Sequence, residues 1–212
     1  MERRSPKSSA PGNRAARPGI VEGRSGKGDA AGVIRFQSRE DPDIDVVWTW
    51  FEFQLALIGE SHANVLRGLR SGMTLGVHEQ QFIGFTLDEI EEFFAAQRGQ
   101  LELLVMFELL ATTEAVLRIE VKTRATARKK DSLSRRFRRL NQSRGDKIRL
   151  DEDILTAMKD EGVTAGAISD FRGALKLRHW LAHGRHWHPK LGRGYTPNDV
   201  FDISRALIHA IP

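Results

Sequence analysis

The residues of this chain best suited to acid-base and phosphate chemistry lie in the segment 177–185. Arg178 and His183 are five positions apart there, on an apolar-periodic stretch that ends at Gly184. An arginine stays protonated and binds phosphate through two parallel hydrogen bonds, whereas a histidine exchanges a proton near neutral pH. Together the two side chains supply two parts of the chemistry that cleaves an RNA phosphodiester.

The spacing of this pair has a geometric consequence on a helix. Residues five apart are turned by about 140° and displaced by about 7.5 Å, so Arg178 and His183 cannot share one face. His179 and His183 are four apart and are expected to be stacked neighbours, while Gly184 is well placed to end the helix. A second copy of the chain would resolve the geometry, because a twofold axis presents the same residues twice. We therefore expect a homodimer.

The same segment resembles a known signature. The run LRHWLAHGR at residues 177–185 is similar to the Arg-x4-6-His signature of the HEPN family (higher eukaryote and prokaryote nucleotide-binding domains), many of whose members are ribonucleases. The resemblance implies an all-α, HEPN-like helical bundle that dimerises, so that Arg178 and His183 of both copies line one cleft. His179 stands where many members have Asn, which keeps a polar residue at that place.

A looser resemblance involves the long apolar-periodic stretch that precedes this segment. Residues 114–118 read EAVLR, and the family often carries polar side chains that face the cleft on the corresponding helix. This resemblance adds Glu114 and Arg118 as candidate substrate-binding residues. Arg185, two positions after His183, is the third candidate of this kind.

The resemblance also implies a mechanism and a role. We expect a metal-independent endoribonuclease in which His183 helps to remove the 2′-hydroxyl proton of single-stranded RNA, while Arg178 stabilises charge on the phosphate. His179 or the partner's His183 would protonate the leaving 5′-oxygen, giving a 2′,3′-cyclic phosphate. No cofactor is expected. The implied role is that of a toxin or phage-defence effector, and a toxin would have an antitoxin protein as partner beside the RNA.

Each of these residues also has a structural interpretation. Arg178 would pair with an acidic residue of the bundle, and His183 would cap the helix C-terminus. The histidines at 179, 183, 186 and 188 raise the question of a metal ion, but no Glu follows His179 as the helical zinc-protease motif requires, so no metal site is predicted. The alternative functions are a non-catalytic module that binds RNA or a nucleotide, and a helical interaction protein.

Composition favours one soluble domain with a basic tail. The chain has 212 residues, of which 40% are hydrophobic, enough for a sizeable core. Residues 1–32 are rich in Ser, Pro, Gly and Arg and are predicted to be a disordered basic tail, ahead of a single helical domain at 33–212. Because the chain shows neither a membrane span nor the apolar stretch of a secretory signal, we expect a cytoplasmic protein without membrane contact. The absence of cysteine excludes disulfides and thiolate catalysis.

Basic residues are concentrated in two regions. The first 28 residues hold seven basic and two acidic side chains, which accounts for the net charge of +5. Residues 118–149 hold thirteen basic and three acidic side chains. This second region is either a solvated helix face or the surface along which an RNA backbone lies. Trp187 is expected in the core or in a dimer contact, although an exposed Trp187 would stack on a nucleobase.

Apolar periodicity and capping residues predict the helices that must position this chemistry. Apolar residues recur at helical spacing over 45–69, although residues 47–55 also alternate partly like a strand. Thr86 and Glu89 form a capping-box pattern that opens a long helix or helix pair, with Gly99 as a candidate break. The remaining predicted helices cover 132–143, 151–161, 166–183 and, after an N-cap at Thr196 and a first-turn proline, a last stretch to about 210.

Overall fold

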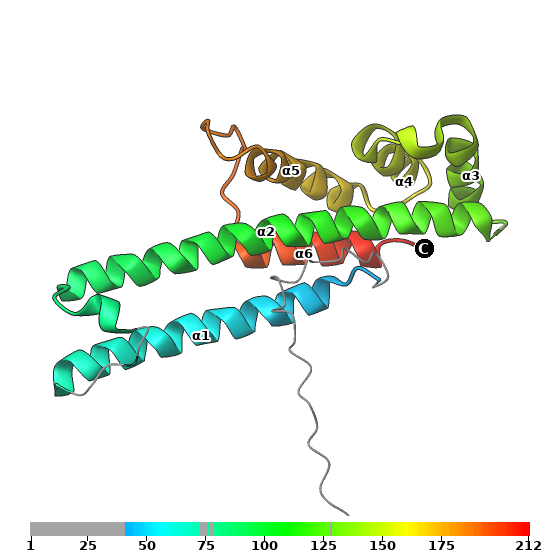
Figure 1. Cartoon of the computed structure of the whole chain (residues 1–212). Helices are drawn as coiled ribbons and strands as arrows, with labels where there is room; N and C mark the ends of the chain where they lie inside the picture. The colour runs from blue at the N-terminus through cyan, green and yellow to red at the C-terminus, as the bar shows by residue number, and fades with distance from the viewer. Residues whose placement is uncertain (1–40, 73–75, 77–78, 128) are drawn as a thin grey trace, which may run out of the picture. The chain divides into compact units, whose positions relative to one another are not determined.

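The computed structural model describes residues 41–72, 76, 79–127 and 129–212. These residues contain six α-helices, with no β-strand among them (Figure 1), so the predicted all-α class is confirmed. No helix in these ranges combines the length and the apolar character needed to cross a membrane. The tail predicted at 1–32 lies outside the described residues.

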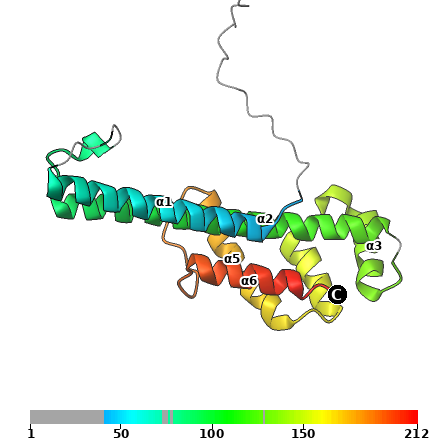
Figure 2. The same ribbon diagram turned by 90° about the horizontal axis from the view of Figure 1, so that it is seen from below.

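Two long antiparallel helices form the frame of the fold. Helix α1, Ile44–Ser71, lies along helix α2, Leu87–Thr126, over the N-terminal part of α2 (Figures 1 and 2). A short 3-10 helix, Glu79–Phe82, precedes α2. The capping box predicted at Thr86 and Glu89 is present, because the Thr86 hydroxyl accepts from the Glu89 amide while the Glu89 carboxylate accepts from the Thr86 amide at 2.8 Å. Residues 47–55, whose apolar pattern also alternates partly like a strand, are helical, so the helix prediction for this stretch is confirmed.

Helix α2 continues through Gly99 without interruption for 40 residues, so the candidate break at this glycine is wrong. A glycine inside a helix costs about 1 kcal/mol relative to alanine, which packing against a neighbouring helix easily outweighs. Helix α1 packs along α2 and supplies this tertiary support. The result is one continuous spine, about 60 Å long at the rise of an α-helix.

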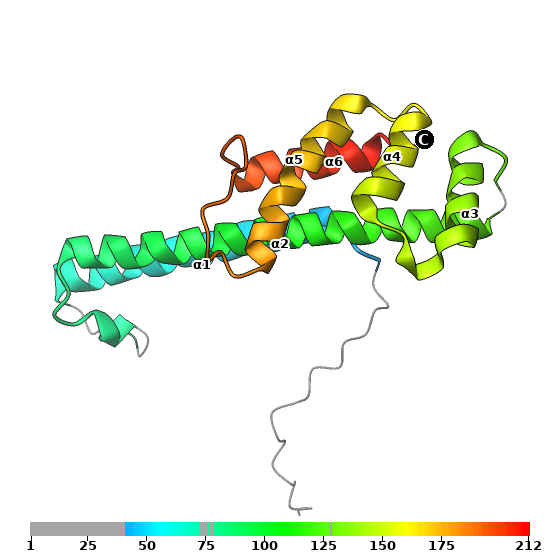
Figure 3. The ribbon, with the colours of Figure 1, turned by 90° about the horizontal axis from the view of Figure 1, so that it is seen from above.

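The remaining helices pack on the C-terminal part of this spine. The predicted helices at 132–143, 166–183 and 197–210 are confirmed, and the one at 151–161 is confirmed as two helical pieces. Helices α5 and α6 both contact α2 and each other (Figure 3). In chain order these elements are α3 Ser132–Arg144, a π-helical turn Leu150–Leu155, α4 Thr156–Asp160, α5 Ala165–Ala182 and α6 Pro197–His209.

In the described part of the chain, the buried apolar side chains form two separate clusters. The main core includes Phe51, Leu110, Phe137, Phe171 and Leu207, and so joins α1, α2, α3, α5 and α6. A smaller second cluster contains four buried residues near the turn between α1 and α2: Val65, Phe82, Ile90 and Phe94. The segment 177–185 is therefore held by the main core, on which Leu177 is buried and Trp180 and Leu181 pack.

One face of α1 stays apolar and exposed. Its side chains follow one another at intervals of four, three and four residues, with 40% to 65% of each exposed: Val46, Trp50, Phe53 and Leu57. Figure 1 shows α1 and α5 on opposite sides of α2. This apolar stripe is thus remote from the segment 177–185.

Candidate functional site

The signature residues Arg178, His179 and His183 lie at the C-terminal end of α5. The helix ends at Ala182, and Gly184 adopts the left-handed conformation with φ of 79°. The Arg185 amide donates to the Trp180 carbonyl at 3.2 Å, which is the 6→1 bond of a Schellman motif. Gly184 therefore ends the helix as predicted, and the chain turns sharply just after His183.

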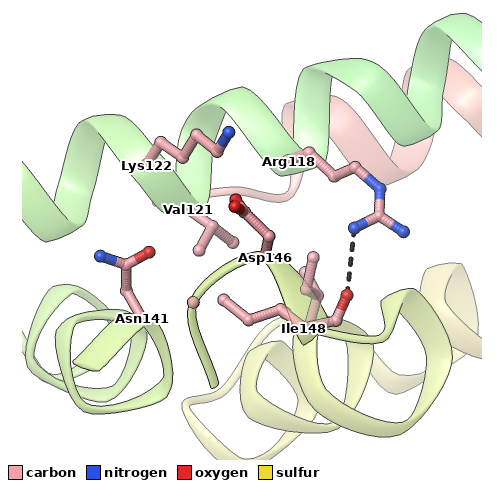
Figure 4. A pocket seen from close by; sticks show the side chains of 8 residues that line it. Arg118, Val121, Lys122, Asn141, Asp146 and Ile148 are labelled. Atoms are coloured by element: carbon pink, nitrogen blue, oxygen red, sulfur yellow. Dashed lines mark hydrogen bonds between the residues drawn. The ribbon is translucent and has the colours of Figure 1, made fainter. Parts of the chain in front are cut away.

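Three of the predicted site residues meet around one carboxylate. Glu114 on α2 lies 3.2 Å from Arg178 on α5, measured between Oε2 and Nη2. The other oxygen of Glu114 accepts from Arg118 Nε at 2.9 Å, and Arg118 Nη1 donates to the Ile148 carbonyl at 3.1 Å (Figure 4). We call Glu114, Arg118 and Arg178 the Glu114 cluster. The structure brings Arg178 of α5 beside Glu114 of α2, although the two residues are far apart in the sequence.

The Glu114 cluster keeps a positive charge, because one carboxylate faces two guanidinium groups. Arg178 also lies over the ring of Phe107, 6.0 Å from its centroid, and its Nε is buried without a hydrogen-bond partner. The side chain of Arg178 remains 37% exposed. The structural interpretation predicted that Arg178 pairs with an acidic residue of the bundle, and Glu114 is that residue. The cluster nevertheless keeps one net positive charge, which attracts phosphate.

The candidate histidines gather on the other side of the helix end. The rings of His179 and His183 are 4.3 Å apart, and the Trp187 ring lies 6.1 Å and 6.3 Å from them, between centroids. His186 Nδ1 donates to the His183 carbonyl at 3.0 Å, since a carbonyl only accepts, and its ring meets that of Trp187 edge on at 4.5 Å. We call His179, His183, His186 and Trp187 the histidine cluster. His179 and His183 are neighbours at the helix end, as predicted, with their ring planes tilted by 54° rather than stacked.

The Glu114 cluster and the histidine cluster are not joined by a direct contact. Within the described part of the chain no hydrogen bond, ion pair or ring contact links Arg178 to His183. This separation follows from the rotation of about 140° between residues five apart on a helix. One chain therefore presents the two halves of the predicted pair on different sides of α5.

Arg185 lies apart from the Glu114 cluster. Its Nη2 donates to Gln100 Oε1 at 3.2 Å, which ties the loop after α5 to the N-terminal part of α2. Gln100, Phe107 and Glu114 follow one another at intervals of seven residues, or about two helical turns, and so lie on one face of α2. Helix α5 and its following loop cover this face through Arg178 and Arg185.

An open hollow of about 420 Å³ adjoins the histidine cluster. We call it the lysine hollow, and its lining includes Arg172, Lys176, His179, Trp187, Pro189 and Lys190. Sequence reasoning did not single out Lys176 or Lys190. The signal for Lys176 was its spacing of three residues from His179, which puts both on one side of a helix. Lys190 lies in a loop whose apolar residues show no helical or strand periodicity, so no signal in the sequence pointed to it.

The basic region 118–149 serves more than one purpose. Arg124 is only 4% exposed, is paired with Glu120 and Asp131, and donates to the carbonyl of Pro212. It is a structural residue that ties α2, α3 and the C-terminus together. Seven other basic side chains of this region have no carboxylate partner among the described residues: Lys122, Lys129, Lys130, Arg135, Arg138, Arg139 and Lys147.

A smaller pocket of about 150 Å³ lies between α2 and α3. Arg118, Lys122 and Asn141 line it together with Asp146 (Figure 4). Arg118 thus belongs to the Glu114 cluster and to the wall of this pocket. The described residues hold no group of three His, Asp or Glu side chains that could hold a metal ion.

No protein-family model matches this chain, and neither a curated protein nor a solved structure shows significant similarity to it. The likeness to HEPN domains therefore rests on residues 177–185 and on the looser match at 114–118. Membership of that family stays a prediction.

Proposed function

We propose that the chain is a metal-independent endoribonuclease that cleaves single-stranded RNA. The observation that carries the proposal is the arrangement on the last turns of α5. Arg178 is held by Glu114 and stays partly exposed, while the ring of His183 lies 4.3 Å from that of His179, which lines an open hollow. This arrangement supplies a fixed cation for a phosphate and two imidazole rings for proton transfer.

The proposed reaction uses the 2′-hydroxyl of the RNA as the nucleophile. His183 accepts the 2′-hydroxyl proton while the oxygen attacks phosphorus, and the bond from phosphorus to the 5′-oxygen breaks. His179 or the partner's His183 gives a proton to that leaving oxygen. Arg178 binds a non-bridging oxygen, on which charge develops. The products are a 2′,3′-cyclic phosphate and a free 5′-hydroxyl, and each proton transfer contributes about 10²- to 10⁴-fold to the rate.

A homodimer is part of the proposal. Arg178 and His183 of one chain lie on different sides of α5, so a second copy that faces this helix end would complete the set of groups around one phosphate. Helix α1, which carries the apolar stripe, lies across α2 from α5 (Figure 1). A dimer formed through that stripe would keep the two candidate sites apart, so the proposed dimer uses the α5 side.

The test compares RNA cleavage by the wild type, Arg178→Ala and His183→Ala in EDTA. Arg70→Ala and His209→Ala are matched controls, because both residues are exposed and belong to neither cluster. The proposal is supported if the wild type and both controls cleave the RNA to products with cyclic phosphate ends. The two site variants should lose this cleavage. Cleavage that persists in both site variants would remove the site.

A binding module without catalysis is the second candidate function. It is favoured by the ion pair between Arg178 and Glu114, which gives Arg178 a structural partner, and by the lack of contact between Arg178 and His183. It predicts RNA binding that weakens steeply with salt, with no cleavage at any pH.

A further inference from the structure

The lysine hollow combines an aromatic wall with uncompensated positive charge. Trp187 is 37% exposed, and its position is fixed from two sides. Its carbonyl accepts from Trp180 Nε1 at 2.7 Å, and its ring meets the edge of His186. The hydrogen bond holds the Trp187 backbone and the ring contact supports the indole, whose exposed part offers a flat surface in the lining of the hollow.

The charges around this surface fall into two groups. Arg172 is engaged, because it donates to Asp151 and, at 2.9 Å, to the Thr156 hydroxyl. Asp151 is the only carboxylate of the lining, and this arginine compensates it. Lys176 and Lys190 have no carboxylate partner among the described residues. Two free ammonium groups thus give the hollow its net positive charge.

These features select a ligand that is flat and aromatic at one end and anionic at the other. A nucleotide has this form, because its base stacks on an indole and its phosphate pairs with lysine ammonium groups. Leu175, Pro189 and Leu191 supply an apolar part of the lining for the base. The volume of about 420 Å³ lies within the usual range of small-molecule sites.

We propose that the lysine hollow binds one nucleotide, with a purine base stacked on Trp187 and the phosphate between Lys176 and Lys190. A purine is preferred because its two fused rings cover more of the indole than a pyrimidine does. His179 lines the hollow and also belongs to the histidine cluster, so the bound nucleotide is the neighbour of the phosphate to be cleaved. This last step rests on the proposed function, whereas the binding of a nucleotide does not.

The test is calorimetric titration of the full chain with 5′-AMP, adenosine and 5′-CMP. We expect AMP to bind more tightly than CMP. Trp187→Leu should weaken both AMP and adenosine by about tenfold, as expected for the loss of one stacked base. The double variant Lys176→Ala/Lys190→Ala should weaken AMP and leave adenosine unchanged, because adenosine has no phosphate. Trp50→Leu and Lys147→Ala, which change exposed residues elsewhere, are matched controls and should bind like the wild type.

Trp187→Phe guards against a variant that fails to fold. It keeps an aromatic face and should recover most of the AMP affinity lost in Trp187→Leu. An AMP affinity that is unchanged in both Trp187→Leu and the double lysine variant would overturn the proposal. The absence of saturable AMP binding at millimolar concentration would also overturn it. Its failure is distinct from that of the proposed function: RNA cleavage without AMP binding sinks this inference alone, and AMP binding without RNA cleavage sinks only the ribonuclease.

Discussion

Glu114 on α2 holds Arg178 on α5 through an ion pair of 3.2 Å, and the same carboxylate is shared with Arg118 one turn further along α2. An acidic side chain that is only 18% exposed thus sets the direction of the guanidinium group proposed to bind phosphate. The arrangement makes Glu114 a positioning residue, because it acts on the RNA through Arg178.

Replacing Glu114 by Gln should separate binding from catalysis. The variant gains one net positive charge, so RNA should bind more tightly at low salt. Arg178 loses its fixed orientation, so kcat should fall about tenfold or more. Steady-state kinetics at two salt concentrations measure both effects, and Glu114→Asp should restore part of kcat. An unchanged kcat in Glu114→Gln would show that Arg178 needs no positioning.

Subunit mixing tests whether two copies share one site. Arg178→Ala and His183→Ala should each be inactive alone, and a mixture that has exchanged subunits should regain part of the cleavage. The reason is that a mixed dimer offers one intact Arg178 and one intact His183 to the same cleft. His183→Ala mixed with the Arg178→Ala/His183→Ala double variant is the control, since it lacks every His183. Mixed dimers that form, as seen by analytical ultracentrifugation, and stay inactive would contradict the shared cleft.

The basic region 118–149 should divide into structural and RNA-binding residues. Arg124→Ala should lower the free energy of unfolding by about 2 kcal/mol, because it removes a buried side chain together with its hydrogen bonds to Glu120, Asp131 and the Pro212 carbonyl. Arg139→Ala should change that free energy by less than about 0.5 kcal/mol and weaken RNA binding. Urea denaturation and RNA titration of both variants check the division. Equal RNA affinity in Arg139→Ala and wild type would assign this exposed arginine to the solvated surface.

Gly99 should be replaceable, in contrast with Gly72 at the end of α1. A Cβ at Gly99 meets nothing within 4 Å, and the residue is helical, so Gly99→Ala should stabilise the fold by about 1 kcal/mol. Gly72 has φ of 62°, so Gly72→Ala should destabilise it. Thermal denaturation of the two variants measures the opposite signs. A loss of stability in Gly99→Ala would mean that the helix needs a flexible point there.

The cap of α6 should make stability depend on acid pH. Hydrogen bonds from the Thr196 side chain and then from its backbone amide hold the pKa of Asp199 below its ordinary range. A lowered pKa means that this carboxylate stabilises the folded state above its ordinary pKa, and that the contribution is lost as pH falls through the folded-state value. The difference in unfolding free energy between wild type and Asp199→Asn should therefore be largest near neutral pH and shrink below about pH 4. A difference that stays constant with pH would show that the cap does not need the charge.

The sequence predicts those features that depend on neighbours in the chain. The caps at Thr86, Gly184 and Thr196 are of this kind, because each is a bond between a residue and the backbone a few positions away. The close approach of the His179 and His183 rings also follows from local helical spacing.

Features that depend on packing between distant segments could not be predicted in the same way. The sequence suggests that Arg178 pairs with some acidic residue, but only the crossing of α5 over α2 selects Glu114. The lysine hollow needs the fold of the loop around Lys190, whose residues show no periodicity. At Gly99 the local propensity was misleading: it suggested a break in the helix, but packing between helices keeps α2 continuous there.

The second apolar cluster should let one end of the α1 and α2 pair open independently of the main core. Among the described residues, Val65, Phe82, Ile90 and Phe94 form a set of four buried side chains, separate from the main core that holds α5. This described set is small beside the main core, so the amides at this end of the α1 and α2 pair should open by local fluctuations with a lower free energy than global unfolding. Because the main core does not share these side chains, such opening leaves the Glu114 cluster closed. The chain therefore joins a loosely anchored helical tip to a firmly held candidate site.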